Sequence, residues 1–213
     1  TMLAAGNCQT SQAMAICYNI FEPAERKAAF EQLINLIEEQ EYHLDVGVLG
    51  GRVLFHVLTE FGYSDLAFSM ITRPDYPSYG NWIARGATTL WEVFQPEGSD
   101  RIGSLNHHFW GDISSWFTQA LSGIRMAPHG EPNEVDFRPS FISRLTHAEA
   151  FHIAPAGRIA SAWERDEDDV IVLTVKLPST MHGVIRLESG YVFEGDLAYK
   201  AAESGTYRIH SIE

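Results

Sequence analysis

The sequence predicts a chain in two parts, a series of helices followed by a small antiparallel β-sandwich. Over about residues 1–125, apolar residues recur with the 3.6-residue period of amphipathic helices. From about residue 139, they alternate with polar residues or form short β-branched runs. The change falls near 127–133, a stretch rich in Pro, Gly and Asn. We therefore place a helical domain at 1–126 and a β-domain at 134–213.

Several helical segments are expected in the first part. The first should carry Met14, Cys17, Tyr18 and Phe21 on one face, because these residues recur three or four positions apart. Short loops between consecutive helices favour antiparallel hairpins, and a succession of hairpins without strands suggests a toroid or barrel of helices. The other expected helices cover about 23–40, 54–61, 64–72, 81–85 and 109–124.

The second part shows the alternation of strands. Ile159, Ser161 and Trp163 alternate with residues of the opposite face, and the run at 170–177 is rich in Val and Ile. The acidic stretch 164–169 between them could be offered as a metal site, but a solvated hairpin loop is the commoner role of such a stretch. Several short strands in succession favour a sandwich. Further strands are expected near 183–187, 191–194 and 206–212.

Charge and composition exclude several functions. The net charge of −13, without a basic run, argues against a nucleic-acid partner. No apolar stretch reaches the roughly 18 residues of a membrane span. Cys8 and Cys17 would lie roughly 13 Å apart along a helix axis, too far for a disulfide. Reduced thiols favour a cytoplasmic location. Because the chain opens on Thr1, we expect it to be part of a longer protein, whose location it does not reveal.

The stretch 77–92 holds the first candidate for chemistry. Gly80, Gly86 and two threonines interrupt helix propensity here, and the same stretch contains Trp82 and Trp91. Glu92 then has two interpretations. Three residues after Thr89, it fits a capping box at the start of a helix. Equally, it fits a carboxylate at the rim of a pocket, placed to activate water.

The second candidate is Ser-Leu-Asn-His-His at 104–108, which is expected to open the last long helix. An imidazole at His107 could donate a hydrogen bond to a substrate hydroxyl. Adjacent helix residues do not share a face, so His107 and His108 are poorly placed to bind one ion. His108 and Asp112 provide only two ligands, so no metal and no cofactor is expected. His43, Asp45 and His56 are expected to be structural.

The order of these motifs resembles the α-L-rhamnosidases of glycoside hydrolase family 78. That family carries Gly-Ala-Thr-Thr-x-Trp-Glu, which is matched at 86–92. It then carries Ser-Leu-Asn-His, an aromatic residue, a Gly and a helix that ends in Ala-Gly-Ile. This chain has the Ser-Leu-Asn-His motif at 104–107 and Leu-Ser-Gly-Ile at 121–124. The remaining matches are Gln9, Thr10, 43–45, Gly50, 76–78, Phe109, Gly111, 157–159, Trp163 and Glu164.

The resemblance implies a fold and an activity. The helices would be the C-terminal part of an (α/α) barrel of six hairpins, and the enzyme would remove terminal α-L-rhamnose from glycans or glycosides with inversion. Inversion uses a general acid and a general base about 6.5–9.5 Å apart. The family's base corresponds to Glu92, and its rhamnose-binding histidine corresponds to His107. Trp91 and Asn106 are expected to bind substrate beside them.

Two departures from the family limit this expectation. Val93 and Phe94 stand where the family usually has Arg-Trp. The family's general acid belongs to an upstream Asp-Cys-Pro-x-Arg-x-Glu segment, which nothing here matches. We therefore expect an inactive isolated chain that associates through exposed barrel faces. A carbohydrate-binding module without catalysis, or a helical-barrel hydrolase of another glycoside, remain as alternatives.

Overall fold

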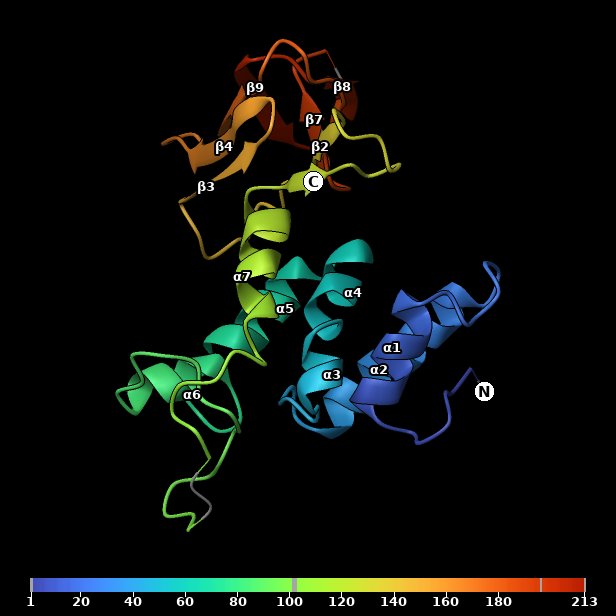
Figure 1. The fold of residues 1–213 in the computed structure, drawn as a ribbon. Coiled ribbons are helices and arrows are strands. Elements are labelled where there is room, and N and C mark those ends of the chain that lie inside the picture. Colours follow the sequence, from blue (N-terminus) through green and yellow to red (C-terminus); the bar gives the residue numbers. More distant parts are fainter. Residues whose placement is uncertain (1, 101–102, 196, 213) are drawn as a thin grey trace. The chain divides into compact units, whose positions relative to one another are not determined.

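The computed structural model describes residues 2–100, 103–195 and 197–212. The chain forms two compact units, Thr1–Ile113 and Ser114–Glu213. The first is helical, and the second contains the strands (Figure 1). Helices followed by a β-sandwich are the predicted fold class, which is confirmed. The exact domain limits, 1–126 and 134–213, stay a prediction.

The first helix packs against the second, the third and the fourth, and the fourth, fifth and sixth helices pack in sequence order. Gly62, at φ +82°, ends the fourth helix in the left-handed conformation that glycine favours. No described helix is both long and apolar enough to cross a membrane. The helices are α1 (Gln9–Cys17), α2 (Arg26–Glu39), α3 (Val48–Gly51), α4 (Leu54–Glu60), α5 (Ser64–Thr72) and α6 (Tyr79–Ala84).

The buried face of α1 differs from the predicted one. The helix ends at Cys17, and Tyr18 is 62% exposed. The face that packs inward carries Gln9 and Gln12, both fully buried. Gln12 Nε2 donates to the carbonyls of Met2 and Ala29, at 2.7 and 2.8 Å. Because buried amides form part of this face, an apolar period could not reveal it.

The last predicted helix is shorter at both ends. Helix α7 (Asp112–Trp116) continues as one π-helical turn, η1 (Phe117–Leu121). Residues 103–111 are not helical, and Ile124 begins a strand. Gly123, at φ +76°, lies between the two, and a Cβ there would stand 2.2 Å from the Pro139 nitrogen. The close approach of that backbone ends the helix.

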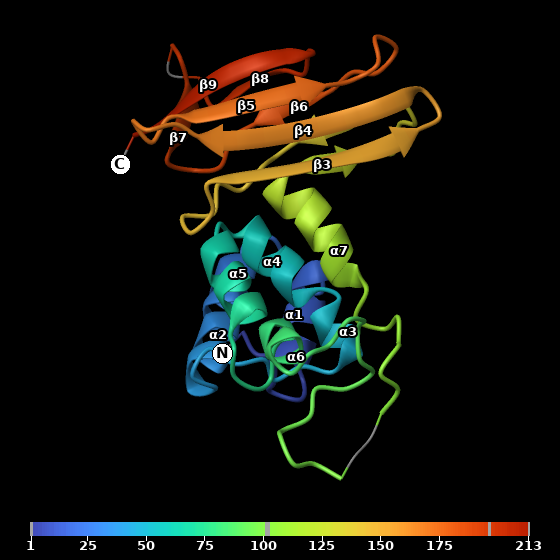
Figure 2. The same cartoon turned by 90° about the vertical axis from the view of Figure 1, so that its left-hand side faces the viewer.

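The second unit is a sandwich of two sheets around one apolar core (Figure 2). One sheet has the order β1–β2–β6–β8 and the other β3–β4–β5–β9–β7. Neighbouring strands pair antiparallel, except for the parallel pair β2–β6. The strands are β1 (Ile124–Met126), β2 (Val135–Phe137), β3 (His147–Ala154), β4 (Gly157–Arg165), β5 (Ile171–Lys176), β6 (Val184–Arg186), β7 (Tyr191–Phe193), β8 (Tyr199–Ala201) and β9 (Gly205–Ser211).

The best-predicted strands are β4 and β5. Ile159, Ser161 and Trp163 all point into the core, as their alternation indicates. The acidic stretch between the strands closes their hairpin, because Asp166 Oδ1 accepts from the backbone nitrogens of Asp168 and Val170. The hairpin prediction is confirmed. Strands β1, β2 and β8 were not predicted, whereas β6 and β7, which are equally short, lie within the strands predicted near 183–187 and 191–194.

Candidate active site

Glu92 lies in an irregular segment, not at the start of a helix. Its backbone nitrogen donates to the carbonyl of Ser104 at 2.8 Å, and the nitrogen of His107 donates to the carbonyl of Leu90 at 2.8 Å. These bonds join 90–92 to 104–107. The Thr89 hydroxyl donates to the carbonyl of Leu105. The capping-box interpretation of Glu92 is therefore wrong, and no helix begins at 104–107 either.

The carboxylate of Glu92 is held at one oxygen only. Its Oε2 accepts a hydrogen bond from the Ser104 backbone nitrogen at 2.8 Å. Its Oε1 has no hydrogen-bond partner among the described residues. The carbonyl of Glu92 accepts from Trp110 Nε1 at 2.9 Å. The backbone is thus fixed on both sides, while one carboxylate oxygen stays available.

A pocket of about 650 Å³ lies against Glu92. Its wall includes two exposed aromatic side chains, Tyr76 and Phe109, and a second carboxylate, Asp45. The wall also contains Phe94 and Trp110, which belong to a cluster of packed rings. Within the cluster, Trp82 stacks on Phe94 at 4.2 Å. The full lining is Cys8, Thr10, Leu44, Asp45, Val46, Gly47, Val48, Tyr76, Pro77, Glu92, Val93, Phe94, Phe109 and Trp110.

The other predicted site residues lie close to Glu92 in the chain but do not line this pocket. Nδ1 of His107 accepts from the Phe109 backbone nitrogen at 3.2 Å, and its ring stacks on that of His108 at 5.2 Å. The Trp91 ring lies under the Arg85 guanidinium at 5.2 Å. Asn106 is exposed. Contacts of Trp91, Asn106 and His107 with substrate stay predictions.

The two histidines are not on a helix, so the helix-face argument against a shared metal does not apply to them. Asp112 instead pairs with His56, at 2.9 Å between Oδ2 and Nε2. Among the described residues, no cluster of three or more His, Cys, Asp or Glu side chains could hold a metal ion.

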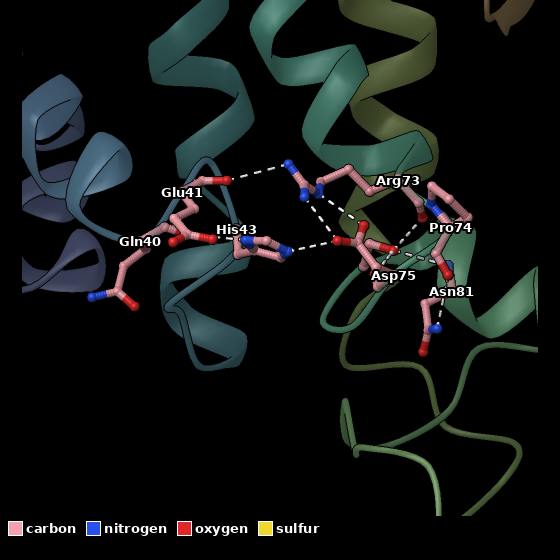
Figure 3. A network of polar contacts seen from close by, with 8 residues as sticks. Gln40, Glu41, His43, Arg73, Pro74, Asp75 and Asn81 are labelled. Atoms are coloured by element: carbon pink, nitrogen blue, oxygen red, sulfur yellow. Dashed lines mark hydrogen bonds and ion pairs between the residues drawn. The ribbon is translucent and has the colours of Figure 1, made fainter.

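A polar network joins two loops beside the pocket (Figure 3). His43 Nε2 lies 2.8 Å from Asp75 Oδ2, and Arg73 donates to both oxygens of Asp75, at 2.9 and 2.8 Å. Arg73 also donates to the carbonyl of Glu41 at 3.2 Å. The hydrogen bonds from Arg73, and then that with His43, hold the pKa of Asp75 well below its usual range. Sequence reasoning assigned His43 a structural role but missed its partners, which lie 30 residues or more away.

Replacing Asp75 by Asn is expected to destabilise the helical unit by less than about 1 kcal/mol, because the carboxylate is half exposed. A carboxyl group whose pKa is lower in the folded protein than in the unfolded chain, where it is about 3.9, stabilises the fold above that pH. This stabilisation is lost as the pH falls through the folded-state pKa. The difference between wild type and variant should therefore shrink below about pH 4. Urea unfolding at several pH values measures it. If the stability difference between wild type and variant grew in acid, the ion pair between Arg73 and Asp75 would not be what stabilises the fold.

The two thiols should differ in reactivity. The hydrogen bond with the Ser11 hydroxyl lowers the pKa of Cys8, whereas burial raises that of Cys17. The thiolate is the reactive form. Near neutral pH, iodoacetamide should therefore modify Cys8 several times faster than Cys17, as peptide mass spectrometry would show. Equal rates, or a faster Cys17, would contradict the assignment.

Comparisons with known proteins give a family match for both parts of the chain. Residues 3–121 match the model of the bacterial α-L-rhamnosidase six-hairpin glycosidase domain, and 133–191 match that of the bacterial α-L-rhamnosidase C-terminal domain. The chain is 31% identical over 179 residues to an α-L-rhamnosidase of Streptomyces avermitilis, covering 81% of this chain and 17% of that protein. It is 32% identical over 178 residues to one of Formosa agariphila, covering 81% and 19%.

Two solved structures share the fold. The α-L-rhamnosidase from Dictyoglumus thermophilum superposes with a TM-score of 0.81 at 26% identity, over 94% of this chain and 25% of that one. The Streptomyces avermitilis enzyme, in complex with L-rhamnose, gives 0.84 at 27%, over 96% and 22%. The chain thus spans about a fifth of the length of the relatives described above. Taken together, the matches show that this chain belongs to the bacterial α-L-rhamnosidase family, with part of the six-hairpin domain followed by the C-terminal domain.

Proposed function

We propose that this chain supplies the general base of an inverting α-L-rhamnosidase, which releases terminal α-L-rhamnose from glycans or glycosides. The observation that carries the proposal is the position of Glu92. It stands on a pocket wall in a chain of this family, with one carboxylate oxygen held by the Ser104 nitrogen and the other unengaged among the described residues. The Streptomyces avermitilis relative was solved in complex with L-rhamnose, which supports rhamnose as the sugar of the proposed reaction.

The mechanism follows from this geometry. Glu92 Oε1 takes a proton from a water molecule as the water oxygen attacks the anomeric carbon. The glycosidic bond breaks on the opposite face, where a general acid protonates the leaving oxygen. In an inverting enzyme the two carboxyl groups stand about 6.5–9.5 Å apart, which leaves room for the water. The acid motif of the family is not in this sequence, so we place the acid in a segment upstream.

The stereochemistry of the product tests the mechanism. The isolated chain should hydrolyse aryl α-L-rhamnosides negligibly, whereas a protein extended upstream of Thr1 should be active. Proton NMR during the first turnovers should show β-L-rhamnose, which then mutarotates. An initial α-anomer would mean retention and would overturn the assignment of Glu92 as the base.

The absence of the acid motif also keeps a second candidate open, a rhamnose-binding module without catalysis. Titration of the isolated chain with L-rhamnose separates the two. Part of a barrel should bind weakly or not at all, whereas micromolar binding together with an inactive extended protein would favour the module.

A panel of aryl glycosides tests whether another sugar is the substrate. The expected self-association of the chain can be checked by light scattering.

A further inference from the structure

The pocket beside Glu92 contains a second carboxylate, Asp45, for which the mechanism has no use. We propose that Asp45 binds hydroxyl groups of the sugar ring and thereby determines which sugar the site accepts. The inference rests on the proposed function, since it takes the pocket at Glu92 as the rhamnoside site. Three features carry it: a loop fixed from two sides, an uncommitted carboxylate, and exposed aromatic rings in the same wall.

A buried glutamine on α1 holds the backbone of the loop that contains Asp45. Gln9, on α1, has no exposed surface. Its Nε2 donates to the carbonyl of His43 at 2.9 Å, and its Oε1 accepts from the backbone nitrogen of Asp45 at 3.1 Å. The side chain between these two bonds, Leu44, is itself buried. Both ends of one amide thus hold three consecutive residues, so the Asp45 backbone has a defined place on the pocket wall.

The polar network of Figure 3 fixes the same loop from the other side. The His43 ring reaches Asp75, and Arg73 joins Asp75 to the carbonyl of Glu41. The loop that contains Asp75 continues directly into Tyr76 and Pro77, which line the pocket. The network therefore ties together the two loops that carry Asp45 and Tyr76.

The carboxylate of Asp45 is exposed and, among the described residues, has no hydrogen bond or ion pair of its own. A fixed backbone with free acceptor oxygens is a preorganised binding group. An ionised carboxylate can accept hydrogen bonds from two hydroxyl groups, which neighbouring hydroxyls of a pyranose would supply.

The rest of the wall fits the same ligand. Tyr76 and Phe109 are 42% and 46% exposed in the pocket. Aromatic faces suit the C–H edges of a sugar ring, while the carboxylate takes its hydroxyls. A metal ion fits less well, because the described residues contain no cluster of three or more metal-ligating side chains. The site therefore matches a neutral pyranose.

Replacing Asp45 by Asn tests the inference in the extended protein. The asparagine amide keeps the shape of the side chain, but its neutral oxygen is a weaker hydrogen-bond acceptor than the charged carboxylate. We expect the KM for an aryl α-L-rhamnoside and the inhibition constant of L-rhamnose to rise about tenfold, with kcat within about twofold. Asp168→Asn is the matched control, because it removes an exposed carboxylate in the β4–β5 hairpin; it should change none of these values.

Substrates that lack single hydroxyl groups distinguish contact from a structural effect. With rhamnosides deoxygenated at C2, C3 or C4, Asp45→Asn should have a clearly smaller effect on the two analogues that each lack one of its two partner hydroxyls. The tenfold effect should remain with the third analogue. An equal loss for all three would indicate a displaced loop and would overturn the inference. So would a fall of about 100-fold in kcat at constant KM, which would make Asp45 a catalytic acid.

Protection of Cys8 gives a readout that does not depend on turnover, because its thiol lines the same pocket. L-Rhamnose should slow its alkylation in wild type, and Asp45→Asn should need about tenfold more sugar for equal protection. Glu92→Gln separates the two proposals. If that variant retains full turnover, the proposed function fails. If it is inactive while Asp45→Asn binds L-rhamnose as wild type does, only the Asp45 inference fails.

Discussion

Glu92→Gln is expected to lower kcat of the extended rhamnosidase by about 100-fold or more, with KM changed little. The amide oxygen can still accept the hydrogen bond from the Ser104 nitrogen, so the local structure should persist. What the variant loses is the ability to take a proton from the attacking water. Initial rates with an aryl α-L-rhamnoside measure the effect.

Glu97→Gln serves as the control for this variant. Glu97 is exposed in a neighbouring turn and does not line the pocket. It should keep wild-type kcat and KM. Wild-type turnover by Glu92→Gln, or an equal loss in both variants, would remove Glu92 from the mechanism.

Trp163→Ala is expected to lower the free energy of unfolding of the β-sandwich by about 3–5 kcal/mol. Trp163 is 2% exposed in the core, and its ring meets that of Phe141 edge to face at 5.5 Å. Its Nε1 donates to the carbonyl of Leu121 at 2.6 Å. The substitution therefore leaves both a large cavity and an unpaired carbonyl.

Urea unfolding followed by far-ultraviolet circular dichroism measures this effect without relying on the lost fluorophore. Phe151→Ala is the control, because Phe151 lies on β3 and is 56% exposed. It should change the free energy of unfolding by less than about 1 kcal/mol. Equal midpoints for the two variants would contradict the central place of Trp163 in the core.

The elements that the sequence predicted well are those whose buried face is apolar. Helix α2 buries Phe30, Leu33 and Ile37 at helical spacing, and β4 buries every second residue around Ser161. The buried face of helix α1 was harder to predict because Gln9 lies on it. The side-chain hydrogen bonds of Gln9 go to residues 34 and 36 positions away. A polar side chain with distant partners leaves no local pattern.

The candidate site shows the same limit. Motif resemblance, rather than period, singled out Glu92, and the local helix expected around it does not form. Its conformation depends on backbone bonds between 90–92 and 104–107, which pair residues 12 or more positions apart. Asp45 was assigned a structural role because nothing in its neighbourhood indicates a pocket. Only the fold brings it to the wall that Glu92 shares.

Azide rescue of Glu92→Ala in the extended protein tests the central claim most directly. Without a side chain at this position, azide can occupy the place of the water and needs no general base. If Glu92 is the base, azide should restore turnover, and the product should be β-L-rhamnosyl azide, of inverted configuration. An α-L-rhamnosyl azide, or a rate that does not respond to azide, would contradict the assignment.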